Sequence, residues 1–249
     1  MLSHAKRLAA SRSRRAVDLR PLLTSPVRTQ GPRPLCVPFS ISASHEATRV
    51  RLAAPGAEML AVEPLWQHCL HYGGGHSGTT LAAAAAALAA KGQTTETCWP
   101  YNQSLGAGTE PEPAGAATAP WYTGTTVDVP LAHDGIETLV EDALAAELPV
   151  VLVIELTSEF EHPTPSGEIS SPPLNAPVSD YHAVLALGAA TDAARVQRRL
   201  LVRNTWGPGW GAGGYGWLPL DYLIAFAVQA ATIDPTSLAV TQVTMLAAP

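Results

Sequence analysis

Three side chains that lie far apart in the sequence have the chemistry needed for attack on a carbonyl group by a thiol. Cys36 stands where a helix is expected to begin, and the positive end of a helix dipole favours the nucleophilic thiolate. Such a thiol needs a base that takes its proton and a partner that orients the base. His182 and Asn204 follow in that order and have these two chemistries. Gln30, six residues before Cys36, can donate a hydrogen bond to the oxyanion that the attack forms.

The histidine and the asparagine each belong to a β-prone run. His182 heads an apolar run that continues to Gly188, and Asn204 ends a second run that begins at Leu200. Two such runs joined by a polar, turn-like stretch predict a hairpin, which brings His182 and Asn204 side by side. A lone cysteine is more often a small buried hydrophobe. The hairpin favours catalysis instead, because it supplies Cys36 with a base and an orienting partner.

Six short blocks of the sequence resemble the papain-like cysteine peptidases, in the order that this family has them. The block that begins at Cys36 matches the family's CWAFS at three of five positions, and the block that begins at Asn204 is close to NSWGTGWG. The similarity runs from about Ala16 to Ile233, which is nearly the whole chain. The blocks are VDLR (17–20), TSPVRTQG (24–31), CVPFS (36–40), YHAV (181–184), NTWGPGWG (204–211) and GYG (214–216).

The resemblance implies a catalytic role for four residues. Gln30 and the backbone N–H of Cys36 would form the oxyanion hole. His182 would act as the general base and later as the acid that protonates the leaving amine. Asn204 would fix the orientation of the imidazole.

Two further residues are implied at the substrate. Trp206 would cover the hydrogen bond between His182 and Asn204 from water, a position that a core tryptophan would also occupy. Gly78 stands where the family has a glycine whose backbone pairs with an extended substrate, and the glycines at 73–75 fit the same place. A glycine that opens a helix entry for conformational reasons is the other interpretation of Gly78.

The fold class that the resemblance implies is α+β. The family has two lobes, a helical N-terminal lobe and an antiparallel, β-barrel-like C-terminal lobe, with the active-site cleft between them. The patterns agree, since helical ones dominate the first half and strand-like ones the second. We predict helices over 36–51, 64–70, 79–91 and 136–147, and strands over 125–129, 150–156 and 215–218 besides the two runs of the hairpin.

The sequence predicts a single peptidase domain after a short tail. Residues 1–15 are basic and are expected to be disordered, and residues 16–249 form the domain. We place the helical lobe at about 16–120 and the β lobe at about 121–249. The Gly-, Pro- and Ala-rich segment 104–120 is expected to have little structure and to connect the lobes.

The chain departs from the family near its nucleophile. Arg33 stands three residues before Cys36, where the family commonly has a cysteine, and the region of the usual disulfide partner, near 73–77, has no cysteine either. Val37 and Pro38 replace the tryptophan and the alanine that follow the nucleophile in the family. These departures remove no catalytic group, but they change the shape expected for the cleft.

Composition narrows the partners. The chain has 249 residues, a net charge of −6 and a pI near 5.7, which does not suit binding to nucleic acid. The longest apolar segment, 81–90, is too short to span a membrane. We therefore expect a peptide or protein substrate, and neither nucleic acid nor membrane as a partner.

The cysteines and the N-terminus predict a cytoplasmic protein without a metal. Three cysteines and a basic N-terminus that lacks the apolar core of a secretory signal favour free thiols in a reducing compartment. Cys69 and Cys98 are expected to be reduced, as small apolar groups of the helical lobe. His68, Cys69, His71 and His76 lie close together but lack the paired spacing of a zinc site, so no metal or other cofactor is expected.

The predicted function is that of a cysteine endopeptidase that works through a thioester acyl-enzyme. About fifteen residues precede the family-like start, whereas secreted relatives have a long inhibitory propeptide there. We therefore expect narrow specificity, as in the processing of a precursor or leader peptide. Two alternatives stay open: a catalytically silent relative that binds peptides, and a transpeptidase or ligase that passes the acyl group to an amine.

Overall fold

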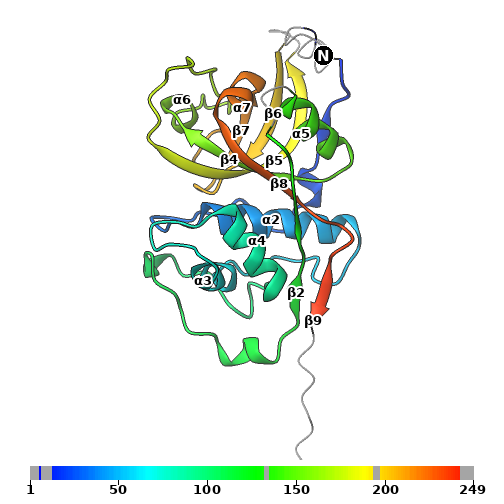
Figure 1. Cartoon of the computed structure of the whole chain (residues 1–249), viewed down its shortest axis with the longest axis vertical. Coiled ribbons are helices and arrows are strands. Elements are labelled where there is room, and N and C mark those ends of the chain that lie inside the picture. Colours follow the sequence, from blue (N-terminus) through cyan, green and yellow to red (C-terminus); the bar gives the residue numbers. More distant parts are fainter. Residues whose placement is uncertain (1–5, 7–12, 132–134, 193–196, 242–249) are drawn as a thin grey trace, which may run out of the picture.

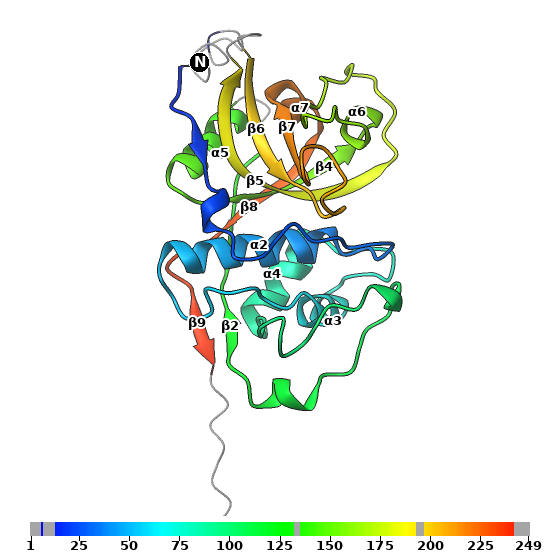
Figure 2. The ribbon, with the colours of Figure 1, turned by 180° about the vertical axis from the view of Figure 1, so that it is seen from behind.

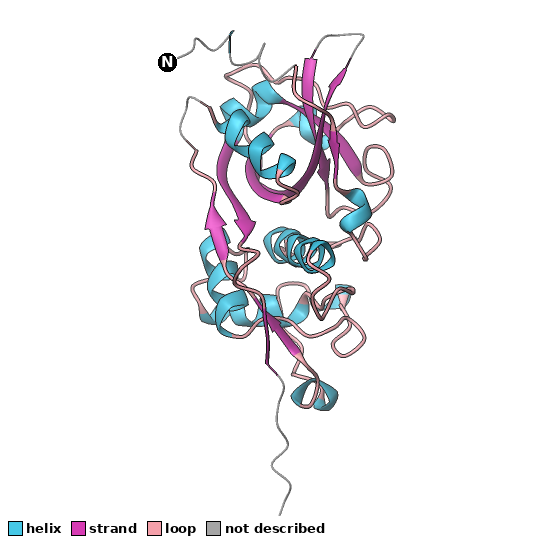
Figure 3. Cartoon of the chain, turned by 90° about the vertical axis from the view of Figure 1, so that its right-hand side faces the viewer, coloured by secondary structure: helices cyan, strands magenta, loops and turns pink. Residues whose placement is uncertain are grey.

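One helix, α2 (Cys36–Arg51), runs through the middle of the molecule, between a lobe of helices and a lobe built on a sheet (Figure 1). The computed structural model describes residues 6, 13–131, 135–192 and 197–241. Pro38 is tolerated in the first turn of α2 because the N–H that proline lacks would have no partner there. Figure 3 views α2 nearly end-on and shows it enclosed by the two lobes. The helix is consequently buried over most of its length.

The helical lobe packs α3 (Glu63–His71) and α4 (Leu81–Ala90) against one side of α2 (Figure 2). The hydroxyl of Thr80 accepts a hydrogen bond from the backbone N–H of Ala83 at 3.1 Å and so caps α4. Gly92, with φ +78°, follows the end of α4 in a conformation that favours glycine. The helices predicted over 36–51, 64–70 and 79–91 are thus all present.

The second lobe is a strongly curved, seven-stranded antiparallel sheet in the order β3-β8-β4-β5-β6-β7, with β1 beside β5 (Figures 1 and 2). Helices α5 and α7 pack against it. The α+β, two-lobed fold is therefore as predicted. The elements of this lobe are β1 (Val17–Asp18), η1 (Arg20–Leu22), β3 (Thr126–Asp128), α5 (Ile136–Ala145), β4 (Val150–Leu156), α6 (Ser158–Glu161), β5 (Asp180–Asp192), β6 (Gln197–Arg203), β7 (Tyr215–Pro219), α7 (Leu220–Phe226) and β8 (Ala227–Ile233).

The predicted hairpin is formed by β5 and β6. These strands pair antiparallel, with Leu185 opposite Arg203. His182, near the start of β5, and Asn204, just after the end of β6, therefore lie at the same end of the hairpin.

The segment 104–120 does not connect the lobes, contrary to the prediction. It contains the end of η2 (Gln103–Leu105) and all of η3 (Ala114–Ala117), and it lies with the helical lobe (Figure 1). The reason is polar contact, since the backbone carbonyls of Gly106 and Gly108 accept hydrogen bonds from the side chain of Arg33. The chain crosses to the sheet only afterwards.

The predicted division near residue 120 also fails at both ends of the chain. Strand β1 lies in the sheet, whereas β9 (Ala239–Thr241) returns to the helical lobe and pairs with β2 (Trp121–Thr123). The guanidinium of Arg49 holds this second pair, because it donates to the carbonyls of Thr123 at 2.9 Å and Ala239 at 2.7 Å. The N-terminal strand β1 therefore belongs to the sheet lobe and the C-terminal strand β9 to the helical lobe, the reverse of the predicted division.

Most of the predicted basic tail lies outside the described residues, which omit 1–5 and 7–12. At its end, Arg14 donates to Asp142 at 2.7 Å, and the backbone carbonyls of Arg14 and Arg15 accept from Arg198. Within the part of the chain that the structure describes, no helix is long and apolar enough to cross a membrane.

The interior of α2 contains a histidine that burial keeps neutral. His45 accepts a hydrogen bond from Arg49 at its Nε2, and its Nδ1 donates to the side-chain oxygen of Gln93 at 3.0 Å. Burial first, and then the positive charge of Arg49, lower the pKa of His45 from 6.5 to about 3. Protonation of this side chain therefore opposes folding.

We predict that the fold loses stability as the pH falls below about 6.5. In the unfolded chain His45 takes up a proton near pH 6.5, but in the folded protein it does so only near 3, so stability is full above 6.5 and declines towards 3. His68 and His182, whose pKa values burial also lowers to about 4, add to the slope. Each such group contributes about 1.4 kcal/mol per pH unit inside its window. Urea unfolding from pH 8 to 4 measures the slope.

Two variants separate the contribution of His45. His45→Gln should fold less stably at pH 8 but show a shallower loss between pH 6 and 4. His162→Gln, which changes an exposed histidine, should keep the wild-type slope. A His45→Gln slope equal to that of the wild type would contradict the assignment.

Candidate active site

A cavity of about 380 Å³ lies where the start of α2 faces the start of β5. Five of the six predicted site residues line it, and the sixth, Asn204, lies behind His182. The structure therefore brings the predicted residues together between the lobes. The five that line the cavity are Gln30, Cys36, Gly78, His182 and Trp206.

Cys36 is the first residue of α2 and is half-buried in the cavity wall. Burial raises the pKa of its thiol, while hydrogen bonds from the backbone of Ala183, Val37 and Cys36 itself act in the other direction. The helix start thus favours the thiolate as predicted, but burial outweighs it. Burial and the hydrogen bonds at the helix start therefore act in opposite directions on the pKa of this thiol.

His182 is buried, and its hydrogen bond to Asn204 decides which ring nitrogen is free. The distance from Nε2 to Asn204 Oδ1 is 2.7 Å, and a carbonyl oxygen can only accept, so Nε2 is the nitrogen that donates. In the neutral ring, Nδ1 then has the lone pair. Burial lowers the pKa of His182 to about 4, against the effects of Asn204 and of the negative charge of Asp180. At neutral pH the imidazole is therefore an uncharged proton acceptor.

Aromatic side chains cover this histidine. The ring of Trp206 lies 4.6 Å from that of His182, and Phe160 lies 5.9 Å from both rings. Trp210 extends the stack, and its indole N–H donates to the carbonyl of Phe160. Trp206 thus packs against the imidazole that makes the hydrogen bond to Asn204. Phe160, on the short helix α6, has no motif that would have identified it.

Both polar atoms of the Gln30 side-chain amide are hydrogen-bonded. Its Nε2 donates to the carbonyl of Arg33 at 2.7 Å, and its Oε1 accepts from the hydroxyl of Thr205. An amide nitrogen has two N–H groups, so one remains available for an oxyanion. Thr205 was not singled out in the sequence, although it adjoins Asn204 in the matched block.

Gly78 lines the cavity in a tight turn. Its N–H donates to the carbonyl of Gly75 at 3.1 Å, and its carbonyl accepts from the N–H of Gly75 at 2.8 Å. A Cβ at Gly78 would meet no atom within 4 Å, so the space beside it is open. A substrate strand that pairs with Gly78 would consequently have to share or replace its bonds to Gly75.

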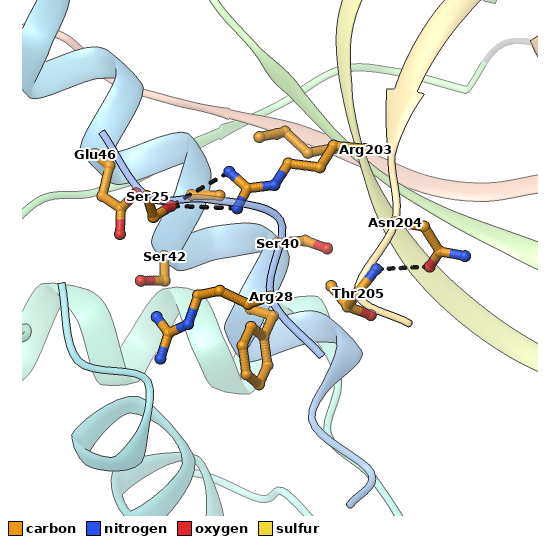
Figure 4. A pocket seen from close by; sticks show the side chains of 11 residues that line it. Ser25, Arg28, Ser40, Ser42, Glu46, Arg203, Asn204 and Thr205 are labelled. Carbon is orange, nitrogen blue, oxygen red and sulfur yellow. Dashed lines mark hydrogen bonds between the residues drawn. The ribbon is translucent and has the colours of Figure 1, made fainter. Parts of the chain in front are cut away.

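A polar chain behind the site joins α2 to the strand that precedes Asn204 (Figure 4). The hydroxyl of Ser25 donates to Glu46 of α2 at 2.6 Å, and Arg203 of β6 donates to the same hydroxyl at 3.3 Å. Arg203 directly precedes Asn204, so this chain of contacts fixes the asparagine relative to the helix that begins with Cys36.

Nothing among the described residues suggests a metal. No group of three or more His, Cys, Asp or Glu side chains in the described ranges is placed to hold an ion. Cys36, Cys69 and Cys98 are all free thiols.

Comparison with known proteins identifies the family. The model of the family described as "Papain family cysteine protease" matches residues 14–223. This chain belongs to the papain family. No curated protein matches it closely enough to be reported as a relative.

Solved structures share the fold of this papain-family protease at low identity. Xylellain, a cysteine protease from Xylella fastidiosa, is 21% identical, with a TM-score of 0.72, over 94% of this chain and 90% of that one. The procathepsin L 3 of Tenebrio molitor is 22% identical, with a TM-score of 0.62, over 86% of this chain and 69% of that one. Bromelain from Ananas comosus is 18% identical, with a TM-score of 0.65, over 88% of this chain and 98% of that one.

A buried ion pair occupies the place where papain-like enzymes commonly have a cysteine. Arg33 and Glu63 are both buried, and the guanidinium binds the two carboxylate oxygens of Glu63. The same guanidinium donates to the carbonyls of Asn102, Gly106 and Gly108. Because the carbonyl of Arg33 holds Gln30, this group of contacts positions the loop that precedes the nucleophile.

We predict that Arg33→Met destabilises the fold by about 3–5 kcal/mol, because it leaves the carboxylate of Glu63 buried without its partner. The double variant Arg33→Met/Glu63→Met should recover part of the loss, since it removes both charges. Arg14→Gln, which breaks the exposed pair with Asp142, should cost less than about 1 kcal/mol. Urea unfolding checks all three. A cost for Arg33→Met as small as that of Arg14→Gln would contradict the role of the pair.

We predict that Gln30→Ala lowers kcat on the order of 100- to 1000-fold, the range seen when one oxyanion donor is removed. Alkylation of Cys36 by iodoacetamide forms no oxyanion, so its rate should not change in this variant. Asn204→Ala should lower kcat less, because Asn204 only orients His182. Steady-state kinetics and alkylation rates measured on the same preparations test both. A Gln30→Ala variant with full kcat would remove Gln30 from the oxyanion hole.

Proposed function

We propose that this papain-family protein is an active cysteine endopeptidase that cleaves peptide bonds through a thioester acyl-enzyme. The hydrogen bond from His182 Nε2 to Asn204 carries the proposal. It leaves Nδ1 as the proton acceptor of an uncharged ring, in the cavity whose wall contains Cys36. A site that only binds peptides has no need of a fixed tautomer.

The first half of the reaction follows from this arrangement. The sulfur of Cys36 attacks the substrate carbonyl carbon while its proton passes to Nδ1 of His182. The backbone N–H of Cys36, which has no partner within the helix, and the free N–H of Gln30 donate to the oxyanion. The C–N bond then breaks, the amine takes the proton from His182, and the acyl group stays on sulfur as a thioester.

The second half returns the enzyme to its starting state. His182 takes a proton from a water molecule as the water oxygen attacks the thioester carbon. The C–S bond breaks, the peptide acid leaves, and the sulfur of Cys36 recovers its proton from the imidazolium. If an amine replaced water in this step, the product would be a new peptide bond. Product analysis with added amines distinguishes the two outcomes.

We further propose narrow specificity, as in the processing of a precursor or leader peptide. The bounded cavity of about 380 Å³, with walls from both lobes, supports selective binding. We also propose a reducing, cytoplasmic setting, which the three free cysteines support.

The pH dependence of Cys36 alkylation tests the proposal. In His182→Ala, the half-buried thiol has no base and burial still raises its pKa, so the rate should stay low and rise only in the alkaline range. The wild type should react at a lower pH, because neutral His182 takes the proton. Its peptidase activity should rise from an acid limb near pH 4 and fall when the coupled pair loses its proton.

Cys36→Ala is the matched variant for turnover and should have no activity while its unfolding curve stays close to that of the wild type. If wild type and His182→Ala gave the same simple alkaline rise, Cys36 would have no functional base. The interpretation as a silent peptide-binding protein would then replace this proposal.

A further inference from the structure

We propose that Asp180 makes this cleft select peptides with an arginine or lysine side chain within two residues of the scissile bond. The proposal rests on the endopeptidase function proposed above and names the class of substrate that the site would take.

The position of Asp180 brings its carboxylate close to the reacting groups. It is the first residue of β5, it is exposed, and it lines the cavity that contains Cys36. Asp180 lies two residues before His182, which is about 7 Å along a strand at roughly 3.3 Å per residue. An extended substrate has a similar rise, so a side chain within two residues of the scissile bond can reach this carboxylate.

The charge of Asp180 acts inside the cavity. Among the described residues that line it, Asp180 is the only Lys, Arg, Asp or Glu. Its Oδ1 accepts the N–H of Tyr181 at 2.7 Å, and its Oδ2 has no hydrogen-bond partner within the described residues. Its negative charge raises the pKa of both Cys36 and His182, which places the carboxylate within electrostatic range of the two groups.

The surrounding wall does not neutralise this charge. The sequence from 148 to 194 contains no Lys or Arg. Glu161 adds a second negative charge near Asp180, because it accepts a hydrogen bond at 3.0 Å from the hydroxyl of Ser179, the residue before Asp180. Across the cavity, the lining residues 77–80 are glycine, serine and threonine. Arg33, in the loop before Cys36, is buried and paired with Glu63. A cationic substrate side chain is therefore the partner that this cleft lacks.

A cationic side chain would bind more tightly in this cleft than a neutral one, because it would form a charge-assisted hydrogen bond to Asp180 in a partly enclosed site. We expect kcat/KM for Arg or Lys to exceed that for Gln by roughly 10- to 100-fold, the range of a hydrogen bond to a charged group. A Glu side chain at the same position would be disfavoured by like-charge repulsion, and the preference should weaken as salt is added.

Matched fluorogenic peptides with Arg, Lys, Gln or Glu at each position flanking the scissile bond test this. The wild type should prefer Arg and Lys at one position. Asp180→Asn keeps the oxygen that accepts the N–H of Tyr181 and should remove the preference, and Asp180→Lys should reverse it towards Glu. Asp221→Asn, which removes an exposed charge on α7 outside the cavity, should leave the preference as it is. A preference that survives in Asp180→Asn would overturn the proposal.

A binding measurement keeps the test separate from catalysis. Fluorescence anisotropy with Cys36→Ala should show tighter binding of the Arg peptide than of its Gln and Glu analogues, and the double variant Cys36→Ala/Asp180→Asn should bind all three alike. If the wild type cleaves no peptide but this ranking holds, the endopeptidase proposal fails and the role of Asp180 stands. If peptides are cleaved without regard to charge and Cys36→Ala binds all three alike, only the role of Asp180 is overturned.

Discussion

Helix α2 is buried and yet polar, and the arrangement of both lobes follows from satisfying its side chains. Glu46 reaches the sheet lobe through Ser25 and Arg203, while Arg49 binds the carbonyls that hold β2 and β9 to the helix. A buried charge without such partners would cost several kcal/mol (of order 3–5). Each contact that α2 needs therefore also fixes the place of its first residue, Cys36. The cleft lies at the end of a helix that both lobes hold.

The same burial determines how the reacting pair is prepared. It raises the pKa of the Cys36 thiol and lowers that of His182 to about 4, so burial disfavours the charged form of each group. Orientation prepares the pair as well: Asn204 selects the tautomer of His182, and the ring of Trp206 packs against the imidazole. An uncharged pair costs less to bury than an ion pair.

The sequence predicted those parts of the fold and site that depend on local pattern. Helix α2 and strand β4 lie within the predicted bounds, and the hairpin that joins His182 to Asn204 follows from two apolar runs. The missed features depend on distant partners. The segment 104–120 stays with the helical lobe because Arg33 binds its carbonyls, and a two-residue strand such as β1 exists only because β5 pairs with it. Strand β8 was not predicted either: three of its seven residues are alanine, which is depleted in strands, and it is held between β3 and β4.

The ion pair of Arg33 and Glu63 has a consequence for the chemistry of sulfur in this protein. A thiolate attacks disulfides, and a bridge three residues from Cys36 would be a neighbouring target for thiol–disulfide exchange. A reductant that keeps the nucleophile from forming sulfenic acid can also act on such a bridge. An ion pair takes no part in electron transfer. The loop that holds Gln30 therefore keeps its shape under the same conditions that keep Cys36 able to react.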